Sequence, residues 1–147
     1  MGPGGGRNDA EAKWNPQTRE TADHSLPYLV ARALMDGKVT LQSFDDDKVL
    51  DPALRPLMQK IRIELLPDHK DYDATRQPVR TIVTLKGGKT IEDNCEYAIG
   101  HAMRPGTRAQ LDEKFMSQVE PISGSDKAAK LLAQIRSLAS MRDVSEL

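Results

Sequence analysis

Ionisable and hydroxyl side chains are crowded into residues 18–28, immediately before an apolar helical pattern begins. The run TRETADHSLPY contains Arg19, Asp23, His24, Ser25 and Tyr28. A guanidinium can bind an anion, a histidine beside an aspartate can exchange protons, and two hydroxyls can donate hydrogen bonds. An ordinary helix start needs only one such group as a cap. The excess predicts a site for anion binding and proton transfer.

Each of these groups also has a structural interpretation. A histidine at a helix entrance is often a hydrogen-bonded structural residue, so His24 is either structural or a proton-transfer group. Asp23 is expected to cap a helix or orient a neighbour, and Ser25 is expected to be an N-cap. Arg19 either binds an anion or pairs with Glu20. The residue types alone leave these alternatives open.

Apolar residues at helical spacing follow this run and predict a helix from Ser25 to Asp36, with Gly37 ending it. Pro27 falls in the first turn, where proline is tolerated. If the helix already includes His24, that residue and Tyr28 share one face, because they are four residues apart. The stripe consists of Leu26, Leu29, Val30, Ala33 and Leu34.

A second helical segment is expected to begin near the three carboxylates of residues 45–47, which suit a helix N-terminus. Its apolar residues are Val49, Leu50, Leu54, Leu57 and Met58. Pro52 and Pro56 predict an interruption. Asp51 is placed to cap the second part, with Pro52 at its first position and Pro56 bending it.

Alternating apolar and polar residues then predict three strands, over residues 61–65, 79–85 and 91–97. Gly87 and Gly88 lie between the last two, as in a hairpin turn that requires positive φ. The polar loop over residues 68–73 lacks the oxygen-ligand spacing of a calcium loop, so no metal site is expected there.

Two further helices complete the expected order. A loop over residues 100–106 leads to Thr107 and Gln110, which have capping-box spacing. Residues 121–124 are expected to break this helix, and Ser125 is expected to cap the last one. Helices that are separate from a small antiparallel β-meander define an α+β fold, because βαβ units would alternate strands with helices.

Composition limits the classes of function. The chain has 147 residues, of which 38% are hydrophobic, and a net charge of -1, so we expect one lean domain and no nucleic-acid or membrane partner. The single cysteine excludes an internal disulfide and suggests a reducing compartment. No apolar run approaches a membrane span, and no leader pattern is visible. Residues 1–17 are expected to form a flexible glycine-rich lead-in, and residues 18–147 the domain.

Three separate stretches carry a resemblance to a known family. They are RETADHSLPY followed by ARALMDG over residues 19–37, DP with LMQKI over residues 51–61, and GHAMRP with EKF over residues 100–115. In this order, and with strands between them, they resemble the C-terminal part of the 2-methylcitrate dehydratase (MmgE/PrpD) family. The resemblance runs from about Lys13 to the end.

The resemblance implies the small, lid-type α+β portion of a two-domain fold. It implies a lyase that acts on small polycarboxylates without metal or organic cofactor, by way of a carbanion or enolate beside a carboxylate. Dehydration, as in propionate metabolism, is the favoured reaction; decarboxylation and epimerisation are alternatives. The implied compartment is the cytoplasm, or the mitochondrial matrix in a eukaryote.

The resemblance also suggests site residues. Tyr28 is the tyrosine of the family's HSxxY pattern and is expected to be catalytic, with His24 as its helper. Arg19, Ser25, His101 and Arg104 are candidate substrate-binding residues. For the last two, a solvated loop is the alternative to a role in closing the pocket.

The family's KxxxxH pattern does not precede Arg19, so part of the expected site is missing from this chain. The resemblance therefore implies a partner, either a complementary chain carrying the helical domain or a second copy, and no turnover by the chain alone. Two alternatives remain: a non-catalytic dimerisation or docking module derived from the family, and an independent α+β interaction domain.

Overall fold

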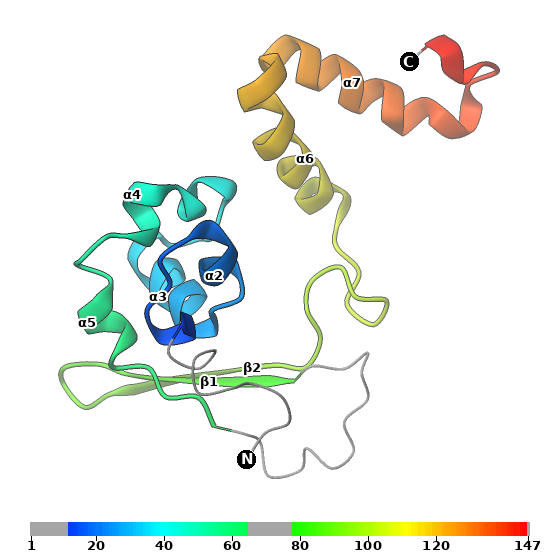
Figure 1. Cartoon of the computed structure of the whole chain (residues 1–147). Helices are drawn as coiled ribbons and strands as arrows, with labels where there is room; N and C mark the ends of the chain where they lie inside the picture. The colour runs from blue at the N-terminus through cyan, green and yellow to red at the C-terminus, as the bar shows by residue number, and fades with distance from the viewer. Residues whose placement is uncertain (1–11, 65–77, 147) are drawn as a thin grey trace. The chain divides into compact units, whose positions relative to one another are not determined.

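The computed structural model describes residues 12–64 and 78–146 (Figure 1). It contains two compact units, residues 1–66 and 67–147, and each is described by itself. The first unit is helical, and the second has a β-hairpin followed by two helices. The expected α+β class is therefore confirmed. None of the described helices combines the length and apolarity needed to cross a bilayer.

The first unit begins with α2 (Arg19–Asp23) and α3 (Leu26–Asp36), which are separated by a short break. Thr18 caps α2 through a capping box. Ser25 caps α3 by accepting a hydrogen bond from the backbone N–H of Tyr28, and Gly37 ends this helix with a φ of 78°. The predicted limits of α3 are confirmed, since a left-handed residue at this point favours glycine.

The next segment is more interrupted than one helix. It consists of η1 (Leu41–Phe44), α4 (Asp46–Val49) and α5 (Arg55–Met58). Asp51 accepts a 2.8 Å hydrogen bond from the N–H of Ala53, but the residues after Pro52 form a turn. Pro56 lies at the start of α5, where it fits the helix without bending it.

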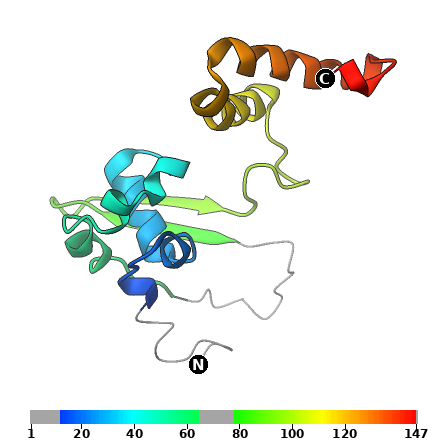
Figure 2. The ribbon, with the colours of Figure 1, turned by 45° about the horizontal axis from the view of Figure 1, so that its top comes forward.

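The core of the first unit is small, as the low hydrophobic content of the whole chain predicted. Figure 2 shows α2 to α5 gathered into one group. Residues 12–14 are helical, and the buried Pro16 precedes α2. In the expected flexible lead-in, residues 12–14 thus form a helical turn and Pro16 is buried, whereas residues 1–11 lie outside the described residues. The core cluster is Ala22, Tyr28, Ala31, Val49, Leu54 and Met58.

The second unit begins with β1 (Val79–Thr84) and β2 (Thr90–Cys95), an antiparallel pair in which Val83 faces Ile91. Gly88 has a φ of 79°, as the predicted turn requires. The expected first strand of the meander is not found: residues 61–64 are not a strand, and the sheet in the described part has two strands. Ile61 packs instead on the helical core. Residues 65–77, including the polar loop, lie outside the described residues.

Two helices, α6 (Arg108–Ser123) and α7 (Ser125–Ser137), follow the hairpin. The capping box of Thr107 and Gln110 is confirmed. The expected break over residues 121–124 is found at Gly124: α6 continues through Pro121, because a proline in the last turn removes only one backbone hydrogen bond, and ends at Ser123. Gly124, with a φ of 81°, separates the two helices and is the N-cap residue of α7. Ser125 was expected to be that N-cap, but it is the first residue of the helix.

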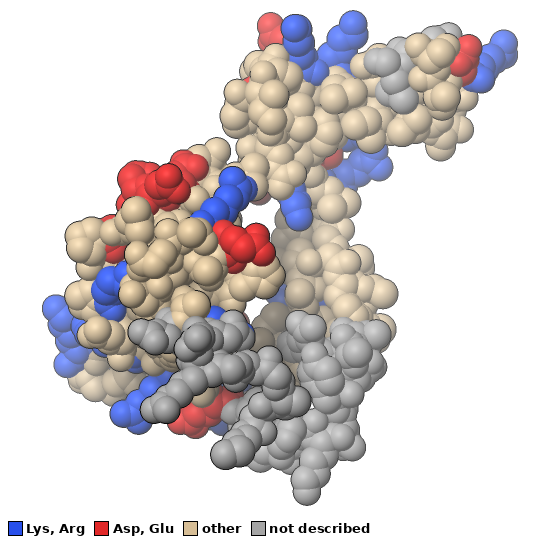
Figure 3. Space-filling view, in the orientation of Figure 1, with Lys and Arg blue, Asp and Glu red and all other residues tan. Residues whose placement is uncertain are grey.

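Both helices keep much of their apolar surface exposed. No residue of α6 is buried, and Leu111 and Ile122 are 59% and 87% exposed. In α7, Ala128 is buried. Asp112 of α6 and Arg136 of α7 form an ion pair that links the two helices. Side chains of both charge signs are present on the face shown in Figure 3, in keeping with the small net charge.

Candidate functional site

Tyr28 lies in the core of the first unit and not on its surface. Its side chain is fully buried on α3, and its hydroxyl donates a hydrogen bond to the backbone carbonyl of Ser43 in η1. The ring lies 6.1 Å from that of Phe44. Burial raises the pKa of Tyr28, and the positive charge of Arg32 opposes this effect. The phenol is therefore a neutral hydrogen-bond donor at ordinary pH.

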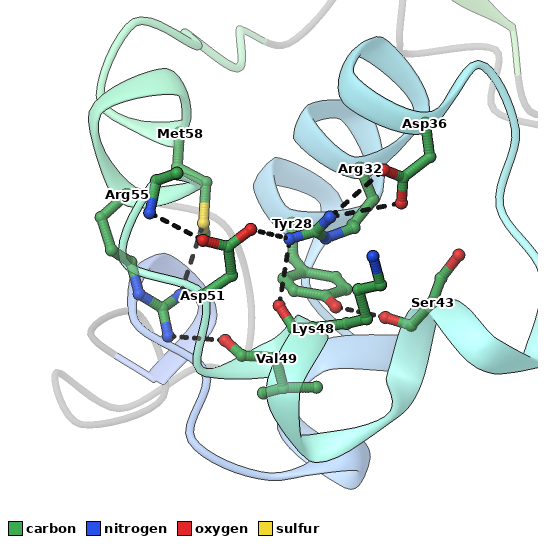
Figure 4. A network of polar contacts seen from close by, with 10 residues as sticks. Tyr28, Arg32, Asp36, Ser43, Lys48, Val49, Asp51, Arg55 and Met58 are labelled. Atoms are coloured by element: carbon green, nitrogen blue, oxygen red, sulfur yellow. Dashed lines mark hydrogen bonds and ion pairs between the residues drawn. The ribbon is translucent and has the colours of Figure 1, made fainter.

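Arg32 is a second buried polar residue on the same helix, and Figure 4 shows it beside Tyr28. Its Nη2 donates to Asp51 at 2.7 Å and to the carbonyl of Lys48 at 3.2 Å. Its Nη1 lies 3.2 Å from a carboxylate oxygen of Asp36. These hydrogen bonds raise the pKa of Arg32 despite its burial. The guanidinium is thus fixed and always charged.

We did not predict this network from the sequence, although two signals were present. Arg32 interrupts an otherwise apolar helix, and it is four residues from both Tyr28 and Asp36. Side chains at this spacing are neighbours on one helix face. The contact with Asp51, 19 residues away, could not be inferred from helical periodicity alone.

The end of α4 is held by two arginines from different elements. Arg32 of α3 binds the carbonyl of Lys48, and Arg55 of α5 binds the carbonyl of Val49 at 3.0 Å. Arg55 also binds the carbonyl of Pro16 at 2.7 Å. The last carbonyls of a helix lack partners within it, so cationic donors stabilise them. These contacts hold the helices around Tyr28 in place.

His24 lies on the surface, with a side chain that is 71% exposed. Its Nδ1 lies 3.0 Å from the carbonyl of Glu20 and 2.6 Å from a carboxylate oxygen of Asp23. These two partners, the carbonyl first, raise the pKa of His24. Nε2 takes no part in these contacts, so it can exchange a proton with a bound molecule. His24 borders a surface depression of about 210 Å³, lined by Ala12, Lys13, Glu20, Thr21 and His24.

The structure does not bring His24 and Tyr28 together on one helix face. His24 is the C-cap of α2, and α3 begins only after Ser25. The condition for a shared face, one helix containing both residues, is therefore not met. One side chain is exposed and the other is fully buried.

Ser25 and Arg19, the other two candidate residues near His24, also differ in exposure to solvent. Ser25 is buried, and its hydroxyl both caps α3 and donates to the carbonyl of Lys13, so these contacts occupy it. The expected N-cap role is confirmed. Arg19 is exposed, and the described contacts include no ion pair between it and Glu20. Its guanidinium is accessible to an anion.

His101 and Arg104 belong to the second unit and form one tight loop. The N–H of Arg104 donates to the carbonyl of His101 at 2.8 Å, and the ring of His101 stacks on that of Tyr97 at 4.7 Å. Arg104 Nη1 donates to the carbonyl of Tyr97 at 3.1 Å and lies 3.2 Å from the sulfur of Cys95. The loop is therefore held by its own contacts. Over the part of the chain that is described, no cluster of three potential metal ligands occurs.

The chain belongs to the MmgE/PrpD family: residues 5–140 match the sequence profile of the MmgE/PrpD C-terminal domain. This match covers the described helices of the first unit, the hairpin, and all of α6 and α7. The predicted family is therefore confirmed.

Several characterised relatives share this region. Cis-aconitate decarboxylase of Homo sapiens is 29% identical over 133 residues, covering 90% of this chain and 27% of that protein. The mitochondrial 2-methylcitrate dehydratase of Yarrowia lipolytica is 28% identical over 76% of this chain and 22% of its own length. The 2-methylcitrate dehydratase of Escherichia coli is 33% identical over 61% and 19%, respectively. The chain thus spans between 19% and 27% of the length of these relatives.

Proposed function

We propose that this chain supplies the C-terminal-domain side of a lyase site that acts on small polycarboxylates. The observation that carries the proposal is the family match over residues 5–140. By their names, its relatives are a decarboxylase and dehydratases, and their named substrates, cis-aconitate and 2-methylcitrate, carry several carboxylates. The chain covers about a quarter of those proteins at most, so the proposal includes a second wall of the site from a complementary chain segment or a second copy.

The described residues supply three groups that such a reaction needs. Loss of water requires a base for the carbon-bound proton and an acid for the departing hydroxide. In the proposed reaction His24 Nε2 accepts the carbon-bound proton, Tyr28 gives its phenol proton to the hydroxide, and water leaves as the double bond forms. Proton exchange with solvent then returns His24 and Tyr28 to their starting forms. Arg19, which is exposed, binds a substrate carboxylate.

This assignment requires a local movement around Tyr28. In the structure the Tyr28 hydroxyl donates a hydrogen bond to the carbonyl of Ser43 in η1. This hydrogen bond must break before the hydroxyl can contact substrate. Catalytic hydrogen bonds often form only in the substrate complex. His24 must also face the same substrate, although the structure places it on the surface. The proposal therefore couples substrate binding to a rearrangement of η1.

His101 and Arg104 are proposed as substrate-binding residues of the second unit. The Nη1 atom of Arg104 is engaged with Tyr97 and Cys95, and these contacts leave Nη2 for a carboxylate. The ring of His101 accepts a hydrogen bond at Nδ1 from the N–H of Met103. That contact sets the neutral tautomer, with a proton on Nε2 that can be donated to an anion.

Decarboxylation is the second candidate reaction, and one observation favours it. The alignment with cis-aconitate decarboxylase covers 90% of this chain, whereas those with the two dehydratases cover 76% and 61%. In this case the bond to one carboxylate breaks, carbon dioxide leaves, and the acid of the site protonates the resulting carbanion. The same carboxylate-binding groups serve both reactions.

A segment exchange tests the proposal and separates the two reactions. The matching segment of the E. coli 2-methylcitrate dehydratase is replaced by this chain, and the hybrid is given 2-methylcitrate and cis-aconitate separately. The ultraviolet absorbance of a new double bond conjugated with a carboxylate reports dehydration of 2-methylcitrate, and released carbon dioxide reports decarboxylation. The control is the E. coli protein from which the matching segment has been removed without a replacement. We expect turnover of one substrate; a folded hybrid that is inactive on both contradicts the proposed function.

A further inference from the structure

Arg32 is the largest fully buried side chain among the described residues. It lies one helical turn after Tyr28 on the buried face of α3, so the two side chains are neighbours. A buried ion pair can often be replaced by apolar residues of similar volume without loss of stability. A charged residue in this small core is therefore poorly explained by stability alone.

The guanidinium of Arg32 is held from three directions. Asp51 and the carbonyl of Lys48 hold Nη2, at 2.7 Å and 3.2 Å, while Asp36 holds Nη1. Within the described part of the chain, Arg32 Nε is buried and has no hydrogen-bond partner. The guanidinium is thus fixed beside Tyr28, and its Nε stays buried without the hydrogen bond that would offset its desolvation (Figure 4).

We propose that Arg32 is a positioning residue for Tyr28: anchored on Asp51 and Asp36, it keeps a positive charge in a fixed place beside the Tyr28 side chain. This inference rests on the proposed function, in which Tyr28 gives up a proton. A phenolate is costly in a buried site, and a neighbouring cation offsets that cost. Arginine suits this role because it stays protonated at every working pH.

The other charged groups around Tyr28 do not replace Arg32. Asp36, on the same helix, raises the pKa of Tyr28, and Arg55 of α5 lowers it less than Arg32 does. The guanidinium of Arg55 is bound to the carbonyls of Pro16 and Val49. The charges of Asp51 and Lys48 border the network, and Asp51 contacts Arg32 directly. Arg32 therefore makes the largest cationic contribution at Tyr28.

Fluorine NMR of the 147-residue chain tests the inference without any need for activity. The three tyrosines are labelled as 3-fluorotyrosine, whose phenol ionises at lower pH, and Tyr28→Phe identifies the signal of Tyr28. We expect Arg32→Met to move the titration midpoint of Tyr28 upward by about 1 pH unit. Arg32→Lys, which keeps the charge, should bring it back toward the unsubstituted value.

The matched control is Arg80→Met, because Arg80 is also ion-paired, with Glu92, but lies in the hairpin. It should leave the Tyr28 midpoint unchanged. If Arg32→Met does not fold, Arg32→Gln keeps a donor toward Asp51 without the charge and is expected to give the same upward shift. A folded neutral variant whose Tyr28 midpoint stays at the unsubstituted value overturns the inference.

Kinetics of the active hybrid provide the second readout. Arg32→Gln should lower kcat by about 10-fold with little change in KM, because Arg32 acts through Tyr28 and does not touch substrate. Loss confined to KM would contradict the positioning role. An inactive hybrid together with a shifted Tyr28 midpoint would refute the proposed function alone, so the two failures are distinguishable.

Discussion

The hydroxyl of Tyr28 determines how the first unit can work, because it is both a core hydrogen-bond donor and the proposed acid. In the structure its proton is directed to the carbonyl of Ser43. A buried carbonyl that loses its donor is left unsatisfied, which is costly. The two roles can be separated by experiment, since one affects stability and the other affects turnover.

Tyr28→Phe should lower the free energy of unfolding of the chain by about 1–2 kcal/mol, because it leaves the carbonyl of Ser43 without its donor. Urea denaturation measures this change. The folded pKa of Tyr28 is raised, so its contribution is fully present below about pH 10 and is lost as pH rises through the folded value. Tyr28→Phe should remove that alkaline loss. Equal stability of the two proteins would show that the hydroxyl contributes nothing to the core.

The contribution of Asp51 to the free energy of unfolding depends on pH in the opposite direction from that of Tyr28. The hydrogen bond from Arg32 and that from the N–H of Ala53 hold the pKa of Asp51 below its usual value. Its contribution is therefore present above about pH 4 and is lost as pH falls through the folded value. Asp51→Asn should flatten the dependence of unfolding free energy on pH in that acid range. Asp126, which lies in α7, provides a control substitution to Asn; an equal flattening there would contradict the account.

At the scale of elements, the ends of α3 show what local sequence can predict. The cap at Ser25 and the stop at Gly37 follow from residue types, because each is determined by its own backbone conformation. The hairpin turn at Gly88 follows in the same way. The strand expected over residues 61–65 is not found at residues 61–64, because a strand depends on a partner that its own sequence does not specify. Alternation alone does not supply a neighbouring strand, and Ile61 packs on helices instead.

The stop of α3 can be tested with two glycines. Gly37 has a φ of 78°, so Gly37→Ala should destabilise the chain by about 1 kcal/mol. Gly87 has no such constraint and no atom within 4 Å of an added Cβ, so Gly87→Ala is the matched control. Thermal denaturation compares the two. A larger loss for Gly87→Ala would contradict the assigned backbone roles.

At the scale of the whole molecule, the family could be predicted from three short motifs, whereas the arrangement of the site could not. The motifs are local runs of sequence, and the profile match over residues 5–140 confirms the family they indicated. The contacts of Arg32 with Asp51 and of Tyr28 with Ser43 join residues 19 and 15 positions apart, so they depend on how the helices pack. Helical periodicity alone therefore did not separate the buried Tyr28 from the exposed His24.

The most direct test of the central claim is the turnover of the segment-exchange hybrid with and without Tyr28→Phe. We expect the hybrid to convert one of the two polycarboxylates, and we expect kcat of the variant to fall by at least about 100-fold, because the acid is lost. The folded state of both proteins is checked by circular dichroism. Unchanged kcat in a folded Tyr28→Phe hybrid would contradict the claim that this chain contributes Tyr28 to a lyase site.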